Sequence, residues 1–90
     1  MNLSDRVVIP AQVMARQVGE ETIILDLASG MYFGLDAVGA RIWQLMGEGK
    51  TLADVCAAMR AEYEVSPEDI ARDVISLAES LCSRQLISAA

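Results

Sequence analysis

The sequence contains no histidine, and this absence excludes several kinds of active site. Without imidazole the chain has no Ser-His-Asp or Cys-His nucleophile pair, and no histidine that could ligate a metal. Its two cysteines, Cys56 and Cys82, lack the spacing of a metal site. Both fall in segments with helical periodicity, which favours buried free thiols over the alternative of a Cys56–Cys82 disulfide. We therefore expect a protein that is not an enzyme and that needs no metal and no cofactor.

Basic residues are also scarce. Seven Lys and Arg face 13 Asp and Glu, which gives a formal net charge of −6. A protein that binds nucleic acid by electrostatic attraction would concentrate basic residues on one face, so this balance argues against such a partner. Hydrophobic residues make up 53% of the 90 positions. This content predicts a packed core, and the length fits a single domain over residues 1–90.

No long apolar run is present. The first ten residues lack the basic segment and apolar stretch of a signal peptide, and no segment approaches the roughly 18–20 apolar residues that span a bilayer. We therefore expect a cytoplasmic protein with no membrane partner.

The first third of the chain has the pattern of β-strands. Segments 6–10 and 12–18 are short and β-prone, and Pro10 between them predicts an edge or a bend. Residues 22–27 and 31–35 alternate in hydropathy, and Gly30 between them suits a hairpin turn. We predict a three-stranded antiparallel meander. The residues that share a face by alternation are Ile23, Leu25 and Leu27 on one strand, and Met31, Phe33 and Leu35 on the next.

Three helices are predicted after the strands, each from a start signal. Asp36 is the expected cap of a helix over 37–46, and Thr51 the cap of a helix that runs to about residue 62. Ser66 and Pro67 begin a third helix over 67–85, with two acids in its first turn. The expected apolar stripes of the first two helices are Val38, Ile42, Leu45 and Met46, and Leu52, Val55, Cys56, Met59 and Tyr63.

The third helix carries more apolar surface than a single contact needs. One stripe is Ile70, Val74, Leu77 and Leu81, and a second, about 100° around the axis, is Ala71, Ile75, Ala78 and Cys82. Either both stripes are buried between the sheet and the helices, or one lines a groove. The fold class that these elements predict is α+β, a three-stranded antiparallel meander followed by three helices, with a winged helix-turn-helix-like arrangement.

A winged helix suggests DNA binding, but the charges of the third helix argue against it. Its two arginines, Arg72 and Arg84, are outnumbered by four acids, and such a surface repels phosphate. A peptide or protein partner fits better. Strand 31–35 closes the meander, so its unpaired backbone groups could accept another strand, and Gly34 permits close approach. The alternatives are that the N-terminal segment, or a second copy, covers this edge.

The sequence resembles a known family at several points in order. Residues 25–43 read Leu-Asp-Leu-Ala-Ser-Gly-Met-Tyr-Phe-Gly-Leu-Asp-Ala-Val-Gly-Ala-Arg-Ile-Trp, which resembles the signature of the PqqD-like family. Further matches are Gly-Lys-Thr-Leu-Ala-Asp-Val at 49–55, Tyr-Glu-Val at 63–65, Asp73-Val74, Leu77, and the closing Leu86-Ile87. The similarity extends over roughly residues 6–88. Within the family the chain looks most like the stand-alone leader-binding proteins of lasso-peptide clusters.

The resemblance implies a role without chemistry of its own. Family members are recognition elements that grip the leader of a ribosomally synthesised precursor peptide and present it to maturation enzymes. In a lasso-peptide setting these would be a leader peptidase and a macrocyclase. The alternative within the family is a peptide carrier for a radical SAM enzyme in pyrroloquinoline quinone biosynthesis. Outside it, the alternatives are a winged-helix DNA-binding regulator and an adaptor that dimerises edge to edge. We expect a monomer or a weak homodimer.

The resemblance also implies where the leader lies. It would add as a strand to residues 31–35, in a groove against the third helix, while Trp43 and Tyr63 pack in the core. Gln85 stands where family members often have glycine, which implies a differently shaped helix end. The expected peptide-binding residues are Met31, Tyr32, Phe33, Gly34 and Leu35 on the strand, and Ile70, Asp73, Val74 and Leu77 on the helix.

Overall fold

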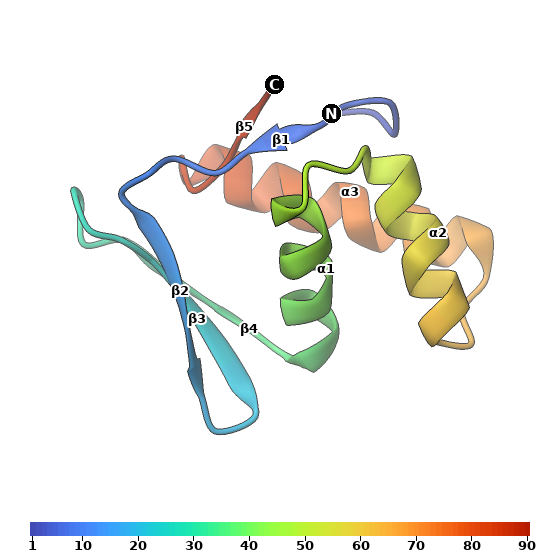
Figure 1. Cartoon of the computed structure of the whole chain (residues 1–90), viewed down its shortest axis with the longest axis horizontal. Helices are drawn as coiled ribbons and strands as arrows, with labels where there is room; N and C mark the ends of the chain where they lie inside the picture. Colours follow the sequence, from blue (N-terminus) through green and yellow to red (C-terminus); the bar gives the residue numbers. More distant parts are fainter.

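A computed structural model describes all 90 residues of the chain. A twisted sheet lies on one side of the molecule and three helices lie on the other (Figure 1). α1 contacts both the sheet and α2, and α2 packs on α3. The elements are β1 (Val7–Val8), β2 (Val13–Val18), β3 (Glu21–Asp26), β4 (Tyr32–Leu35), α1 (Ala37–Gly47), α2 (Leu52–Glu62), α3 (Pro67–Ser83) and β5 (Ser88–Ala89).

The main sheet is the predicted antiparallel meander, with strand order β2-β3-β4. Val18 pairs with Glu21 across a two-residue turn, in which Gly19 has a φ of +64°. Gly30 takes a φ of +76° before β4, as the sequence predicts for this turn. Because L-residues avoid this left-handed region, glycine is the residue that permits both turns.

A second, two-stranded sheet joins the ends of the chain. β1 and β5 pair antiparallel, with Val7 opposite Ala89, and both termini lie at the same end of the molecule (Figure 1). The sequence did not predict this sheet. Pro10 accepts a hydrogen bond of 3.0 Å from the Val13 amide, which bends the chain between β1 and β2 as expected. The N-terminal segment therefore pairs with β5 and leaves the edge of β4 uncovered.

All three predicted helix caps are confirmed. The Asp36 side chain accepts from the Gly39 amide at 2.8 Å, and the side chains of Thr51 and Ser66 each accept from the amide three residues on at 3.1 Å. These bonds satisfy amides that have no partner within the first helical turn. The sequence signals therefore place all three helix starts correctly.

α3 ends two residues earlier than the sequence predicts, in a Schellman motif. The amide of Gln85 donates to the Cys82 carbonyl and the amide of Leu86 donates to the Leu81 carbonyl, both at 3.0 Å. Gln85 takes the left-handed conformation with a φ of +61°, and it is the one residue other than glycine that does so. The chain thus makes with glutamine the turn that glycine usually makes.

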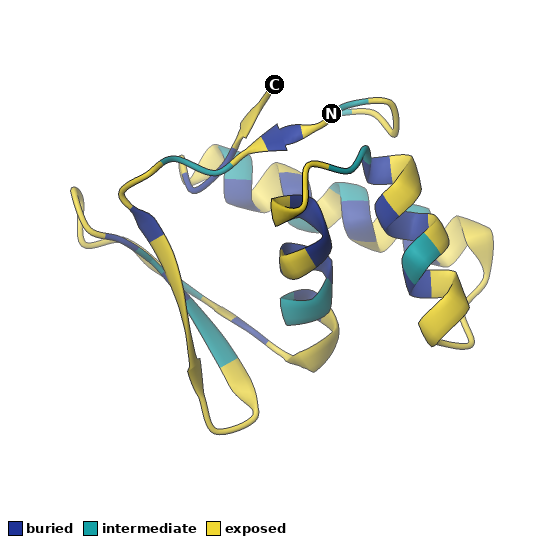
Figure 2. Cartoon of the chain, in the orientation of Figure 1, coloured by how far each residue is buried: buried dark blue, intermediate teal, exposed yellow.

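The core lies among α1, α2 and α3 and on the side of the sheet that faces them (Figure 2). Trp43 is buried in it, as expected. Tyr63 is not: it lies beyond the end of α2 with 38% of its surface exposed, so its assignment to the core is wrong. Val38, in the first turn of α1, is likewise exposed, so its assignment to the core is also wrong.

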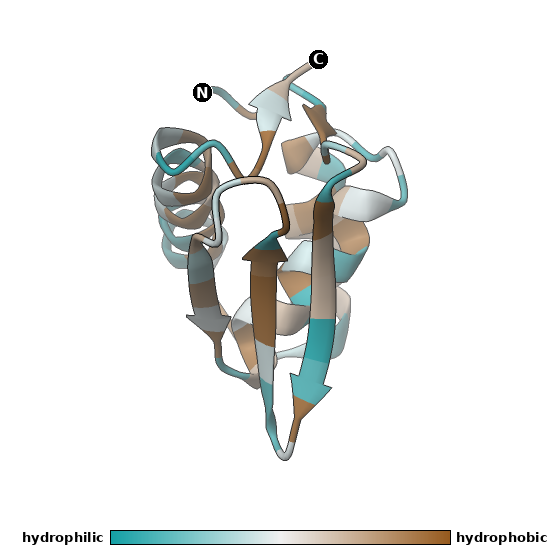
Figure 3. Cartoon of the chain, turned by 90° about the vertical axis from the view of Figure 1, so that its left-hand side faces the viewer, coloured by the Kyte–Doolittle hydropathy of each residue, from teal (hydrophilic) through white to brown (hydrophobic).

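The sheet buries only one of its faces. On β3 the buried residues are Ile24 and Asp26, while Ile23 and Leu25 lie on the opposite, outer face. The middle of this strand is strongly apolar (Figure 3). The predicted alternation is therefore confirmed, and the tertiary structure decides which set faces the core. None of the helices has the length and hydrophobicity needed to cross a membrane.

Candidate functional site

β4 is a free edge of the main sheet. Its inner side bonds to β3, and the Asp26 amide donates to the Met31 carbonyl at 2.9 Å. Alternate residues of an antiparallel strand direct their backbone groups to opposite sides. With Met31, Phe33 and Leu35 directed to β3, Tyr32 and Gly34 present their N–H and C=O groups outward. This edge can therefore accept another strand.

A cleft of about 320 Å³ lies beside this edge, and we call it the β4–α3 groove. Its walls come from three elements that are distant in sequence: β4, the first half of α1, and the middle of α3. The lining is mixed, with apolar side chains and two carboxylates. The lining residues are Phe33, Gly34, Leu35, Asp36, Val38, Gly39, Ile42, Asp73 and Leu77.

The groove brings together five of the nine residues that the sequence analysis singled out. Phe33, Gly34 and Leu35 line it from the strand, and Asp73 and Leu77 line it from the helix. Met31 and Tyr32 are exposed, at the start of the edge strand and outside the cleft.

Ile70 and Val74 require a correction. Their side chains are 2% and 0% exposed in the core, and neither is among the residues that line the groove, contrary to the expectation. Leu77 lies about 60° around the α3 axis from Val74, given 100° per residue, and this rotation directs it toward the strand edge. The predicted apolar stripe of α3 is thus divided: Ile70, Val74 and Leu81 lie in the core, and Leu77 lines the groove.

Sequence reasoning missed the contribution of α1. Val38, Gly39 and Ile42 line the groove. The helical stripe placed Val38 and Ile42 in the core, which is correct for Ile42 and wrong for the exposed Val38. A signal was present in the sequence. Only Asp36 separates β4 from α1, so the first turn of that helix must lie beside the end of the strand.

A further residue near the groove that the sequence analysis missed is Arg84, the C-cap of α3. Its guanidinium lies over the Phe33 ring, 5.0 Å from the centroid, within the range of a cation–π contact. Spacing could have indicated it, because residues 73, 77 and 84 lie within about 40° of one another around a helix. The helix side of the groove region therefore carries an acid, a leucine and an arginine in that order.

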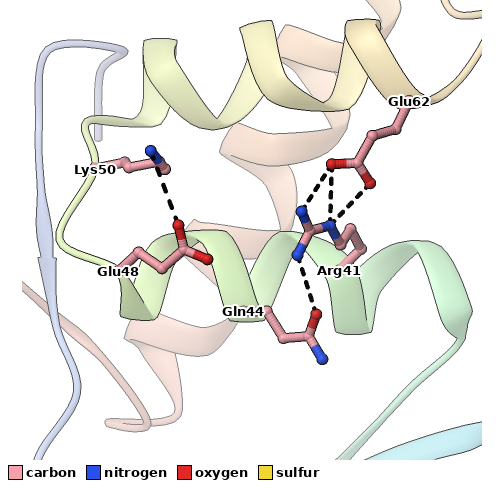
Figure 4. Close-up of polar contacts among 5 residues, drawn as sticks. All are labelled: Arg41, Gln44, Glu48, Lys50 and Glu62. Carbon is pink, nitrogen blue, oxygen red and sulfur yellow. Dashed lines mark hydrogen bonds and ion pairs between the residues drawn. The ribbon is translucent and has the colours of Figure 1, made fainter.

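An ion pair joins α1, which forms the groove's third wall, to α2. The Arg41 guanidinium of α1 donates to Glu62 of α2 at 2.8 Å from both Nε and Nη2 (Figure 4). The hydrogen bond from Arg41 lowers the pKa of Glu62 below its usual range, and the pKa of Arg41 is raised. Nearby, Glu48, the C-cap of α1, and Lys50 of the following loop form a looser pair at 3.8 Å (Figure 4).

The two cysteines are free, in agreement with the sequence analysis. Cys56 is buried, its Sγ lies 4.0 Å from the Ile70 carbonyl, and burial raises its pKa. A raised pKa keeps the thiol protonated, which is the opposite of what a cysteine nucleophile requires. Cys82 is half-buried on α3.

Two other hollows are not walled by two helices, although one of them also lies beside a free strand edge, that of β2. One, of about 400 Å³, lies between the β2–β3 hairpin and α1 and has a largely polar lining that includes Gln17, Gln44 and Glu48. The other, of about 270 Å³, lies on the outer face of β2 and β3, between Met14, Val18 and Leu25. The β4–α3 groove is therefore the best candidate for a peptide site.

Fold and groove together define a small α+β domain that presents a free strand edge beside a helix. Residues 21–87 match the family model described as Coenzyme PQQ synthesis protein D (PqqD). The chain belongs to the PqqD family.

Two solved structures resemble the whole domain. One is TbiB1 in complex with the TbiA(beta) leader peptide, at 38% identity and a TM-score of 0.81, covering 89% of this chain and 93% of that one. The other is a lasso peptide synthetase B1 complexed with the leader peptide, at 29% identity and a TM-score of 0.84, covering 92% and 98%. No curated protein matches the sequence.

Proposed function

We propose that this chain binds the leader of a ribosomally synthesised precursor peptide as an added strand on β4, and delivers it to a leader peptidase in lasso-peptide biosynthesis. The observation that carries the proposal is the outward-facing backbone of Tyr32 and Gly34 beside the β4–α3 groove. The two similar structures, both complexes with leader peptides, support it.

Binding of this kind separates affinity from specificity. Backbone hydrogen bonds to the strand edge are independent of sequence, whereas alternate side chains of the added strand enter the groove. Leu77 and Val38 would contact apolar leader side chains there. The role is therefore recognition without chemistry. By holding the leader, the protein raises the effective concentration of the cleavage site near the peptidase and, later, of the core near a macrocyclase.

A second candidate is a peptide carrier for a radical SAM enzyme in pyrroloquinoline quinone biosynthesis. The observation that favours it is the family model, which is named for the synthesis of that coenzyme. The same strand edge and groove would serve both roles. The identity of the peptide that binds more tightly separates the two candidates.

The direct test is an amide-resolved NMR titration of the ¹⁵N-labelled protein with a synthetic TbiA(beta) leader peptide. We expect saturable shifts at residues 32–36, 73 and 77, and unchanged amides on the exposed side of α2. Titration with duplex DNA should give no saturable shift, because α3 is acidic. Shifts centred on the outer face of β2 and β3, or no saturable shift with the peptide up to about 1 mM, would overturn the proposal.

A further inference from the structure

Arg84 is fixed at one end of the groove without a polar partner. Its guanidinium lies 5.0 Å above the centre of the Phe33 ring, and none of the ion pairs and side-chain hydrogen bonds of the chain involves it. The Schellman motif that follows fixes the backbone at this point. A planar guanidinium held on a ring keeps its N–H donors available for a carboxylate.

The other end of the groove is acidic. Asp73 and Asp36 both line it, but the Asp36 side chain caps α1 through the Gly39 amide at 2.8 Å. Asp73 has one basic neighbour, Arg72, at 3.8 Å, and Arg72 makes a closer contact of 3.1 Å with Asp69. Asp73 is therefore the carboxylate that remains for a ligand, and Leu77 lies between it and Arg84.

The direction of the elements orders these charges. β4 runs from Phe33, beneath Arg84, toward Leu35, near Asp73, so β4 and α3 run in opposite senses. A strand that pairs antiparallel with β4 would pass Asp73 first and Arg84 last. Eleven residues of helix separate the two side chains, which is about 16 Å, and an extended strand covers that length in about five residues.

We propose that the groove selects the charge order of the peptide as well as its shape. The ligand is an extended peptide, antiparallel to β4, with a basic side chain at Asp73 and an acidic one about five residues later at Arg84. The proposal rests on the proposed function, because it describes the leader strand at that site. Antiparallel pairing is adopted because it continues the pattern of the sheet and is the more stable pairing per residue. Asp73 and Arg84 then set register and direction, which backbone bonds alone leave open.

The experiment is a selection from random sequences, which does not require the leader of this protein to be identified. A display library of random 15-residue peptides is panned against the wild-type domain, against the groove variant Leu77→Arg, and against the charge-exchanged variant Asp73→Arg/Arg84→Glu. We expect peptides that enrich on the wild type and not on Leu77→Arg, with Lys or Arg about five residues before Asp or Glu. The charge-exchanged variant should enrich the reverse order.

The strongest selected peptide is then synthesised together with an isomer in which its basic and acidic residues are exchanged. We expect the isomer to bind the wild type about tenfold more weakly, and the charge-exchanged variant to reverse this preference. Circular dichroism confirms that each variant is folded. If the double variant does not fold, Arg84→Gln should reduce the difference between the isomers about threefold.

The outcomes separate the two proposals. Absence of any enrichment that depends on Leu77 would overturn the proposed function itself. Enriched peptides that depend on Leu77 but show no charge order, or the opposite order, would leave peptide binding in place and overturn the selection by charge.

Discussion

The Arg41 guanidinium and the Glu62 carboxylate form a two-point pair that joins the middle of α1 to the last turn of α2 (Figure 4). A planar fork opposite a carboxylate fixes orientation as well as distance. The pair lies behind the groove, because α1 provides the wall formed by Val38, Gly39 and Ile42. The pair therefore adds a pH-dependent contribution to the contact between these two helices.

Because the pKa of Glu62 is lowered in the folded state, its contribution to stability is present above the usual glutamate pKa of about 4.3 and is lost as the pH falls through the lower, folded value. We expect Glu62→Gln to lower the urea midpoint at pH 7 and to have no effect at about pH 2.5. The matched control is Glu64→Gln, an exposed glutamate outside the ion pairs. An equal loss at both pH values would contradict the role of the pair.

Leu77→Arg should weaken binding of the TbiA(beta) leader about tenfold or more. The substitution replaces a half-buried apolar side chain of the groove with a charge that a bound peptide would desolvate. Isothermal titration calorimetry measures the change. Ala57→Arg on exposed α2 adds the same charge away from the groove and should bind as the wild type does. Unchanged affinity in folded Leu77→Arg would place the peptide elsewhere.

Gly34→Pro tests the strand edge itself. Proline removes the outward N–H of Gly34 without removing a bond between β3 and β4, and edge strands tolerate proline. We expect about tenfold weaker leader binding, the effect of about one lost hydrogen bond.

Gly34→Ala is the control for the loss of glycine. It keeps the N–H, and the new Cβ would meet only the Ile23 Cδ1 at 3.7 Å, an ordinary contact. Both variants should remain folded by circular dichroism, and only the proline should weaken binding. Equal affinity of the proline variant would mean that the leader does not pair with this edge.

Gln85→Gly should raise the free energy of unfolding by about 0.5–1 kcal/mol, because glycine adopts the left-handed conformation without the steric cost that glutamine bears. The φ of +61° at Gln85 identifies the position. Urea denaturation gives the value. Ser83 is the last residue of α3 and has helical geometry. Ser83→Gly should therefore lower the free energy of unfolding by about 0.5 kcal/mol. Destabilisation by both variants would show that the Gln85 side chain makes a compensating contribution.

Local sequence determined the elements. The helix starts are marked by Asp36, Thr51 and Ser66. The side chain of each accepts a hydrogen bond from a free amide three residues on, so the signal lies within one turn of the sequence. Gly30 marks the hairpin turn before β4, because the left-handed backbone conformation at this position favours glycine over other residues. The meander predicted the free edge of strand 31–35, and the resemblance to the PqqD family, visible in residues 25–43, then led to five of the groove residues.

Tertiary structure decided which face each element buries. Period-2 alternation on β3 is the same whether Ile24 or the pair Ile23 and Leu25 faces inward, and only packing against α1 selects Ile24. Likewise the stripe on α3 does not reveal that Val74 enters the core while Leu77 reaches the groove, because that division depends on where β4 and α2 lie. The pairing of β1 with β5 and the placement of Arg84 over Phe33 join residues more than 50 positions apart. Such contacts follow from the path of the whole chain, which no local pattern encodes.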